Sequence, residues 1–540
     1  MKITAVDVHD LRFPTSSDLS GSDAVHKDPD YSCVYVVLRT DDAAVPAGYG
    51  LTFTLGRGNE VVAACVRALD YHLVGADFDA DIVADMTDAV DHRGFYYRLC
   101  QDGQLRWLGP EKGVVALACG AIMNAVWDLM ARRANKPVWL LVAEMEPERL
   151  VELIDFKHIA DFVSKDEALA LLKRVRPGWE QRVERMKTVG FRACAWARRA
   201  RARAKEGGRS ARPRALTRLR ASSSLARPPL LARADTTSCG WLGYPEHVVR
   251  AKCRESLAQG HTFFKMKVGS RDVADDVARA QWIRDEIGPD KHLMMDANQK
   301  WNVDEAVRNM KTLAAFRPMW IEEPTNCDDV VGHATIAKAL RAVGGGACGV
   351  ATGEACANKV LFKQLLQLEA IRYCQIDSCR VAGVNEILGV LLMAAKARVK
   401  VCPHAGGVGL CEYVRHLCMI DFVCFNPTDA PDRVCEMVTE CSGYFRERCA
   451  FNQRDDGLYY RAAEQPGYAQ FTDATVRAFA YPHGPEWAGD ARARAARRKM
   501  VAEADRVLAE AGERSKRRAR ALGVALVALA AGWMVARRRK

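Results

Sequence analysis

The fold is decided by the stretch from residue 261 to residue 298, which reads HTFFKMKVGSRDVADDVARAQWIRDEIGPDKHLMMDAN. An apolar run ends at Lys267, a helix-like segment follows, and a second apolar run ends at Asp296. This alternation predicts a strand, a helix and a second strand that runs parallel to the first.

The same unit recurs between Trp241 and Glu436. The later apolar runs read MWIEEP, GVATGE, YCQIDS and VKVCPH. The polar residues that end the six runs are Lys267, Asp296, Glu322, Glu354, Asp377 and His404. Their spacing is that of one strand–loop–helix–loop unit, and side chains at the carboxyl ends of such strands face one mouth of a closed barrel. The pattern therefore predicts an α/β fold, a modified TIM barrel. An open doubly wound sheet is the alternative, but no glycine-rich phosphate loop follows an early strand.

Three further parts complete the predicted organisation. Residues 1–130 form an α+β capping domain, with a strand at 31–39, a turn at 46–50 and a helix at 112–133. The barrel spans 131–436, and 437–490 form a C-terminal segment that packs on the cap. Residues 192–234 interrupt the barrel, and their mixture of Arg, Ala, Ser and Pro predicts a disordered, low-complexity insert.

The net charge of +12 is concentrated in two segments. Residues 192–234 contain thirteen Lys/Arg against one acid, Glu206, and residues 514–540 contain nine basic residues and no acid. The rest of the chain is therefore acidic, at −9. A nucleic-acid-binding protein carries its positive charge on a folded face, so no nucleic-acid partner is expected.

Residues 491–540 form a basic and apolar tail. The run 521–536 holds sixteen uncharged residues between basic clusters, slightly fewer than the roughly 17–25 that span a bilayer. It is a candidate membrane anchor, with an amphipathic or frayed helix as the alternative. The 19 cysteines form no CxxC pair, which indicates a reduced compartment. Residues 1–8 alternate like a strand rather than a targeting leader, and a cytoplasmic or mitochondrial location is expected.

Three acids at successive strand ends predict a metal site. Asp296, Glu322 and Glu354 would repel one another at the barrel mouth unless a cation neutralised them. Oxygen ligands suit a hard ion, and Mg²⁺ takes a few carboxylates while it keeps positions for water and substrate.

Two lysines and a histidine–aspartate pair surround this predicted metal site. Lys265 and Lys267 are two residues apart on one strand, so both point to one face, and crowding with burial is expected to lower a lysine pKa towards that of a useful base. Asp377 ends the strand before that of His404, so it could bond one imidazole nitrogen and raise the basicity of the other.

These motifs together resemble the enolase superfamily in its mandelate-racemase-like branch. The matching elements are Lys265-Met-Lys267, Asp296-Ala-Asn298, Ile321-Glu322-Glu323-Pro324, Thr352-Gly353-Glu354, Ile376-Asp377 and Pro403-His404. Longer runs at 22–31, 51–60, 240–244 and 404–412 resemble the L-fuconate dehydratase family. The resemblance covers roughly 1–191 and 236–485, whereas the insert and the tail have no counterpart in that family.

The resemblance implies a magnesium-dependent acid-sugar dehydratase. Mg²⁺ held by Asp296, Glu322 and Glu354 would bind the substrate carboxylate and stabilise an enediolate. Lys267 would take the α-proton, and His404, oriented by Asp377, would assist loss of the β-hydroxyl. The substrate-binding residues would be Gly21, Ser22, Asp23 and Tyr31 from a capping loop, with Lys265, Asn298 and Glu436 from the barrel.

Two other classes of function remain open. One is a catalytically idle relative that binds a metabolite, and the other is an RNA-binding or membrane-tethered protein that works through its basic segments. Magnesium-dependent turnover would show an enzyme and not an idle relative. Salt-sensitive retention of nucleic acid that requires the insert would support the RNA-binding class. The family resemblance also implies a homo-oligomer.

Overall fold

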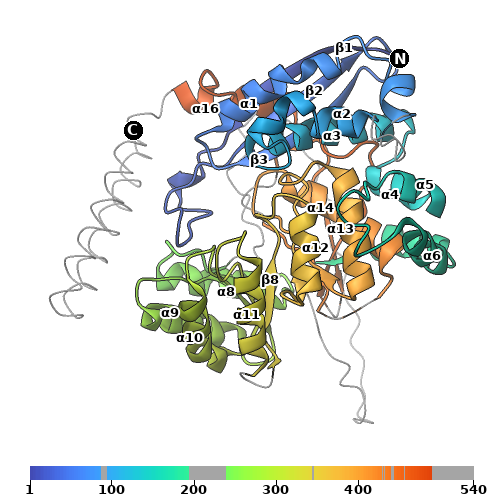
Figure 1. The fold of residues 1–540 in the computed structure, drawn as a ribbon. Coiled ribbons are helices and arrows are strands. Elements are labelled where there is room, and N and C mark those ends of the chain that lie inside the picture. Colours follow the sequence, from blue (N-terminus) through green and yellow to red (C-terminus); the bar gives the residue numbers. More distant parts are fainter. Residues whose placement is uncertain are drawn as a thin grey trace, which may run out of the picture.

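The computed structural model describes residues 1–84, 86, 94–193, 239–342, 346–428, 430, 432–438, 443–454 and 457–488. Its N-terminal part is an antiparallel sheet in the order β1-β2-β3, built from Ile3–Arg12, Ser32–Thr40 and Ala47–Thr54. The helices α1 (Asn59–Ala68) and α3 (Gly113–Arg133) pack against this sheet, and α2 (Phe95–Cys100) packs against α3 (Figure 1).

The turn predicted at 46–50 is wrong, because Ala47 already begins β3. Gly48 and Gly50 act instead as contact points for α3. A Cβ on Gly48 would lie 2.5 Å from Leu129 Cβ, and one on Gly50 would overlap the backbone at Ala121 and Ala125. These glycines are needed because a helix backbone crosses the strand closely.

Helix α3 is the one helix in the described ranges that is long and apolar enough to cross a membrane. However, 83% of its apolar window is buried inside the fold, as in a core helix. The candidate anchor at 521–536 lies outside the described residues.

Six strands form a parallel sheet in the order β10-β9-β8-β7-β6-β5. They are β5 (Phe263–Lys267), β6 (His292–Asp296), β7 (Pro318–Glu322), β8 (Gly349–Thr352), β9 (Tyr373–Cys374) and β10 (Lys400–Val401). The helices that precede, connect and follow them are α8 (Glu246–Ala258), α9 (Val273–Ile287), α10 (Val303–Leu313), α11 (Val330–Arg341), α12 (Lys359–Gln367), α13 (Val384–Ala397) and α14 (Leu410–Ile420). Each strand pairs with its neighbour in the chain, whereas a doubly wound sheet reverses its order at a switch point.

The sheet curves around an apolar layer in the barrel interior. This layer is formed by Phe263, Met294, Trp320, Ala351, Tyr373, Cys402 and Val434. Side chains alternate along a strand, so residues two positions further on form a polar layer above it: Lys265, Asp296, Glu322, Gln375, His404 and Glu436. Lys265 Nζ lies 2.5 Å from Glu436 Oε1 and links the first of these strands to the end of the barrel segment. The predicted modified TIM barrel with an N-terminal cap is confirmed.

The remaining elements join the cap to the barrel. They are α4 (Val138–Ala143), α5 (Pro147–Glu152), α6 (Lys165–Val175), α7 (Trp179–Thr188), β4 (Phe191–Ala193), β11 (Phe451–Arg454), β12 (Gly457–Tyr460), α15 (Asp473–Phe479) and α16 (Pro485–Ala488). Short helical turns lie at Thr15–Ser17, Asp70–His72, Phe78–Val83, Gly103–Leu108, Ala314–Phe316 and Asp421–Phe425.

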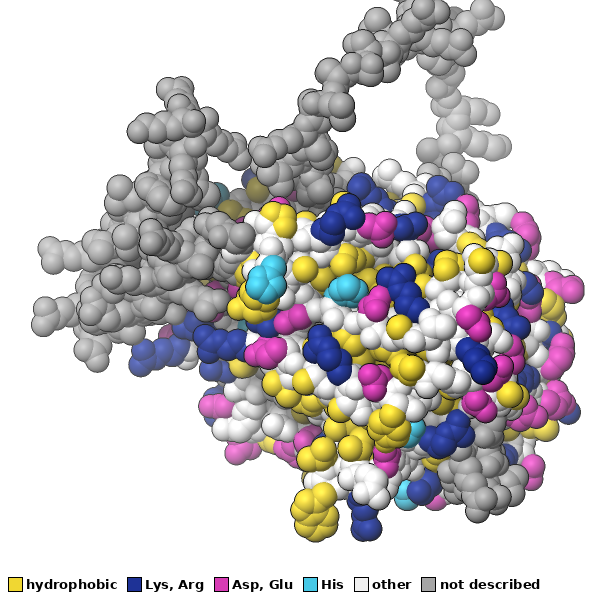
Figure 2. Space-filling model, turned by 90° about the horizontal axis from the view of Figure 1, so that it is seen from above, with side chains coloured by type: hydrophobic (Ala, Val, Ile, Leu, Met, Phe, Trp, Pro, Cys, Tyr) yellow, Lys and Arg dark blue, Asp and Glu magenta, His cyan; other side chains and the backbone are white. Residues whose placement is uncertain are grey.

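The C-terminal segment has two kinds of contact. β11, β12 and β4 form an antiparallel sheet, in which Tyr459 pairs with Arg192. Arg192 and Ala193 therefore belong to β4 and not to the insert, whose other predicted residues lie outside the described ranges. Further along, Phe471 stacks on Phe13 of the cap, and Trp487 of α16 donates to the carbonyl of Arg12 in β1 (Figure 1). Acidic and basic side chains are interspersed on the described part of the face in Figure 2.

Candidate active site

Three carboxylates meet at the carboxyl ends of neighbouring strands. Asp296 ends β6, Glu322 ends β7 and Glu354 follows β8 by two residues. One oxygen of each lies within 4.8 Å of the others. In the described ranges, no other group of three or more His, Cys, Asp or Glu side chains brings its ligand atoms this close together. Burial, followed by repulsion from Glu322, raises the pKa of Asp296 to about 6. Burial likewise raises the pKa of Glu322. A hard divalent cation would relieve this repulsion.

Two buried ammonium groups lie against these acids. Lys265 Nζ is 2.9 Å from Glu322 Oε1, and Lys267 Nζ is 2.5 Å from Asp296 Oδ2. Burial lowers the pKa of each lysine, but the carboxylates outweigh it and raise both values above the ordinary lysine pKa. The carboxylates therefore act against the expected lowering of a lysine pKa, because their attraction exceeds the cost of burial.

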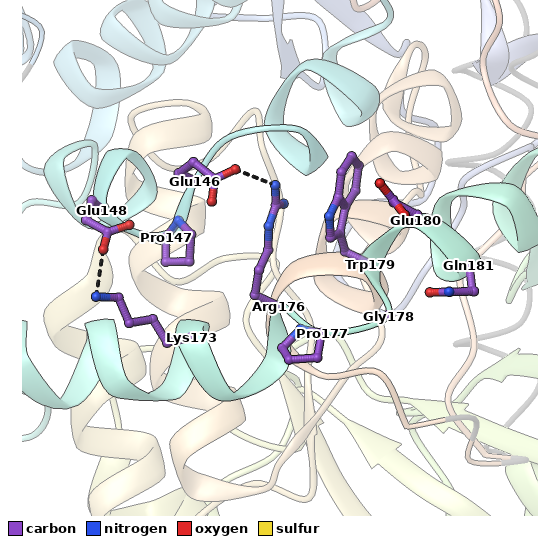
Figure 3. Close-up of a pocket in the computed structure, with 10 residues that line it drawn as sticks. All are labelled: Glu146, Pro147, Glu148, Lys173, Arg176, Pro177, Gly178, Trp179, Glu180 and Gln181. Carbon is purple, nitrogen blue, oxygen red and sulfur yellow. Dashed lines mark hydrogen bonds and ion pairs between the residues drawn. The ribbon is translucent and has the colours of Figure 1, made fainter.

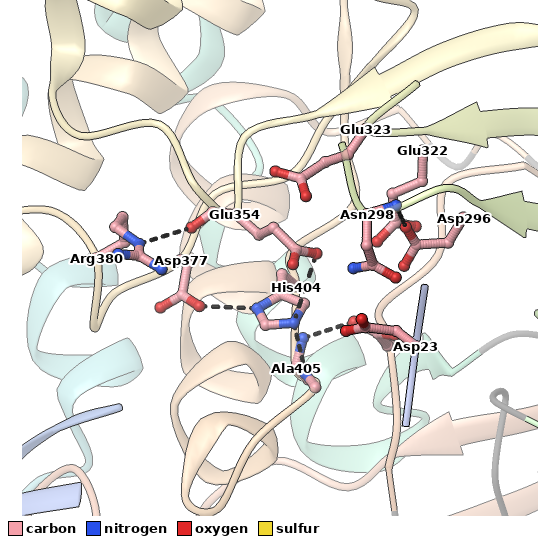
Figure 4. Close-up of polar contacts among 12 residues, drawn as sticks. Asp23, Asp296, Asn298, Glu322, Glu323, Glu354, Asp377, Arg380, His404 and Ala405 are labelled. Atoms are coloured by element: carbon pink, nitrogen blue, oxygen red, sulfur yellow. Dashed lines mark hydrogen bonds and ion pairs between the residues drawn. The ribbon is translucent and has the colours of Figure 1, made fainter. Parts of the chain in front are cut away.

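His404 is held between two acids. Its Nδ1 lies 2.8 Å from Asp377 Oδ2, and its Nε2 lies 3.6 Å from Glu354 Oε2. Burial disfavours the imidazolium, but Glu354 and Asp377 outweigh it and raise the pKa of His404 to about 10. In Figure 4, His404 lies between Asp377 on one side and Asp296 with Glu322 on the other.

Glu436 and Asn298 complete the barrel side of the site. Glu436 Oε2 accepts a 2.7 Å bond from the Ala405 amide. Although burial opposes ionisation, Lys265 and His404 lower the pKa of Glu436 to about 2. The Asn298 backbone N–H donates to Asp296 Oδ1 at 2.9 Å. The side-chain oxygen Asn298 Oδ1 is buried with no partner among the described residues.

The cap contributes the loop 19–31. Ser22 Oγ accepts a bond from the Gly243 amide at 3.1 Å, and the Ser22 carbonyl accepts one from Leu242. Asp23 is buried and close enough to Lys267 for its charge to act on that lysine. The structure thus brings cap residues to the strand ends.

Gly21 lies directly against Tyr31. Gly21 has φ +83°, and a Cβ there would overlap the phenol of Tyr31. Tyr31 in turn packs edge-on against Phe53, with ring centroids 5.2 Å apart. Because Phe53 lies against Gly407 in the turn that follows His404, the capping loop and the histidine turn are in one packed layer.

Sequence reasoning assigned no role to three residues beside this site. His26 Nδ1 lies 3.3 Å from Asp23 Oδ2, and its spacing of three residues from an acid could have indicated this pair. Trp241 packs against Lys267. The run 240–244 by itself indicates only a resemblance to the family. Arg279 lies in the middle of α9, where no sequence signal distinguishes it from a surface arginine.

A separate hollow of about 540 Å³ lies between α5, α6 and α7 (Figure 3). Both of its cations are already paired, Arg176 with Glu146 at 2.8 Å and Lys173 with Glu148 at 2.7 Å. None of the strand-end residues lines it. The chemistry therefore belongs to the barrel mouth.

This fold and site are those of the enolase superfamily, to which the chain belongs. Residues 248–470 match the family model described as enolase C-terminal domain-like. Mitochondrial enolase superfamily member 1 of Xenopus laevis is 45% identical over 487 residues, which cover 90% of this chain and 97% of the relative. L-galactonate dehydratase of Hypocrea jecorina is 41% identical over 491 residues, which cover 90% and 96%.

Solved structures show the same fold. The crystal structure of human mitochondrial enolase superfamily member 1 matches with a TM-score of 0.78 and 44% identity, over 90% of this chain and 98% of that one. L-talarate dehydratase from Polaromonas sp. JS666, complexed with Mg and L-glucarate, matches with a TM-score of 0.57 and 20% identity, over 88% and 97%. Relatives with a named activity include acid-sugar dehydratases and cycloisomerases.

Proposed function

We propose that this protein is a hydro-lyase that dehydrates an acid sugar with Mg²⁺, converting L-fuconate to 2-keto-3-deoxy-L-fuconate. The observation that carries the proposal is the placement of Lys267 and His404 around the three-carboxylate group. A base and an acid beside a cation-binding group are the parts that removal of an α-proton and loss of a β-hydroxyl require.

The residues at the strand ends fit a magnesium ion. Asp296, Glu322 and Glu354 would hold it through oxygen atoms, the donors that Mg²⁺ prefers. Glu354 Oε2 is buried and has no hydrogen-bond partner among the described residues, so a cation would satisfy it. When bound, Mg²⁺ supplies positive charge beside the substrate carboxylate.

The side chains of the chain divide the reaction between them. Lys267 Nζ, in its neutral form, takes the proton from the α-carbon, and the C–H electron pair moves into the carboxylate to form an enediolate. His404 then gives a proton to the β-hydroxyl, which leaves as water while the electron pair forms the carbon–carbon double bond. Asp377 orients His404 through Nδ1. The resulting enol becomes the 2-keto-3-deoxy acid.

The other site residues position the substrate. Lys265, Asn298 and Glu436 contact it from the barrel, and the cap residues Gly21, Ser22, Asp23 and Tyr31 close over it. Asn298 Oδ1 is buried and has no hydrogen-bond partner in the described part of the chain, which supports a role in accepting a bond from ligand.

L-galactonate is the second candidate substrate, supported by the relative named L-galactonate dehydratase. The two acids differ only in a terminal methyl against a hydroxymethyl group. Such a difference is worth about 1–3 kcal/mol in an apolar pocket, so both acids can be turned over at different rates.

A screen of aldonates with purified protein tests the function. L-fuconate and L-galactonate, with MgCl₂ or with EDTA, are followed by the appearance of the 2-keto acid. We expect product only with the metal and a higher kcat/KM for L-fuconate. No keto acid from any aldonate at saturating Mg²⁺ would leave the catalytically idle, metabolite-binding relative as the better description.

Three further expectations concern the assembly and location of the protein. We propose a homo-oligomer, to be checked by light scattering of the eluted protein. The names of the relatives place those proteins in mitochondria, which favours the mitochondrial alternative for this chain. Membrane contact through 521–536 is tested by sedimentation with vesicles.

A further inference from the structure

The segment 240–244 lies between the barrel mouth and the cap. Gly240 forms a parallel bridge with Met266, and the Lys267 amide donates to the Gly240 carbonyl at 2.9 Å. Trp241 therefore lies next to the residue proposed as the base. Its ring centroid is 5.1 Å from Lys267 Nζ, and only 3% of the tryptophan is exposed.

Trp241 has a buried hydrogen-bond donor that no described residue accepts. Its Nε1 lacks a partner in the described ranges. Four other buried tryptophans do find acceptors: Trp127 at Asn385, Trp139 at the Ala463 carbonyl, Trp320 at Glu322 and Trp487 at the Arg12 carbonyl. Leaving a buried donor unpaired is unfavourable, so a ligand acceptor at this position would relieve a cost.

Arg279 holds the segment rigid from beneath. This buried arginine on α9 donates from Nη2 to the carbonyls of Gly240 and Trp241, both at 2.9 Å, and from Nη1 to that of Tyr244 at 3.2 Å. From the other side, Ser22 of the cap bonds Leu242 and Gly243. The indole is thus fixed on its backbone before any ligand arrives, which lowers the entropic cost of using it.

We propose that Trp241 is a substrate-binding residue whose indole N–H donates to a hydroxyl of the acid sugar, an inference that rests on the proposed function. The base must come within about 3–3.5 Å of the α-carbon. A substrate held in this way by Lys267 brings the hydroxyls of the next carbons to the indole.

The test compares Trp241→Phe with Trp139→Phe. The first variant keeps a smaller apolar ring and removes the donor that has no partner in the described ranges. The second removes a donor that is already bonded to the Ala463 carbonyl, away from the strand ends. Kinetics with L-fuconate and L-galactonate in MgCl₂ and melting temperatures of the free proteins are measured for both variants.

We expect Trp241→Phe to raise KM about tenfold for both acids with little change in kcat, as for loss of one hydrogen bond to substrate. Trp139→Phe should keep its KM and lose more thermal stability. An unchanged KM in Trp241→Phe would overturn the inference. The proposed function would still stand in that case, because the wild type turns over substrate. If the wild type turns over no aldonate, the rise in melting temperature caused by L-fuconate is compared between the wild type and Trp241→Phe. The absence of a rise in the wild type, or equal rises in both, would also overturn it.

Discussion

His404 Nδ1 lies 2.8 Å from Asp377 Oδ2, and both side chains are buried at the ends of adjacent strands. β9 and β10 are paired in parallel, with Cys374 opposite Val401. Asp377 and His404 each come three residues later, so they lie at the same height. The contact holds the imidazole ring in one orientation and directs Nε2 toward Glu354. The position of the proposed acid therefore depends on a neighbour that need not touch substrate.

Asp377→Asn should lower kcat for L-fuconate about 10- to 100-fold with little change in KM, the usual cost of losing such a supporting carboxylate. An amide keeps the shape but removes the charge and can donate to Nδ1, which favours the wrong tautomer. Steady-state kinetics measure the effect. Asp128→Asn is the control, because Asp128 is buried and bonds Tyr49 and Tyr468 in the cap region. It should lower the melting temperature and spare kcat. An unaltered kcat in the Asp377 variant would contradict the orienting role.

Lys267 and His404 should separate in a proton-exchange assay in deuterated solvent. In Lys267→Ala, exchange of the α-proton should disappear, because no other side chain is proposed to take that proton. In His404→Asn, dehydration should collapse while some exchange persists, because the lysine remains. Mass spectrometry of recovered substrate measures exchange. Intact exchange in the lysine variant would show that the base has been misassigned.

Magnesium should stabilise the protein more at pH 7 than at pH 5. The pKa of Asp296 is raised to about 6 in the folded protein. In the metal-free protein its protonation therefore favours the folded state below the ordinary pKa of 3.8, and this contribution is lost as the pH rises through about 6. Protons compete with Mg²⁺ for the same oxygen atoms, so the Mg²⁺-induced rise in melting temperature should grow across this interval. It should be absent in Asp296→Asn. A rise that is independent of pH would argue against Asp296 as a ligand.

Gly406→Ala should reduce activity by displacing His404. A Cβ at this position would lie 2.5 Å from His404 Nε2, closer than van der Waals contact allows. Because the imidazole must move, kcat should fall by about 10-fold or more, as for a small misplacement of a reacting group. Gly103→Ala is the control, since nothing lies within 4 Å of an added Cβ there. Equal activities of both variants would contradict the tight packing of the histidine turn.

Deleting residues 194–234 and all residues after 490 should leave a folded, active enzyme. Arg192 and Ala193 are retained because they pair with β12. The deleted insert is rich in arginine and poor in apolar residues, so it cannot offset the entropy of ordering itself. Melting temperature and kcat are compared with those of the full chain. A large loss of either would show that the insert packs on the barrel, and sedimentation with vesicles only when 521–536 are present would support the anchor.

The order of the barrel was readable from the sequence because strands and helices alternate at a steady spacing. Local chain chemistry places Lys267, Asp296, Glu322 and His404 at or just beyond strand ends, and parallel strands bring such ends to one mouth. The cap was less readable. Gly48 and Gly50 indicated a turn by composition, but they serve the close approach of α3, which is a contact between distant segments.

The sequence by itself determined the barrel, the three-carboxylate group and the pairing of Asp377 with His404, because each follows from the periodicity of strands. Only the tertiary structure decided the charge state of the lysines, since their pKa depends on acids from other strands. It also decided where Trp241 and Arg279 lie. An indole N–H without a partner among the described residues and an arginine that bonds backbone carbonyls are defined by distances across the fold, and no local pattern records these distances.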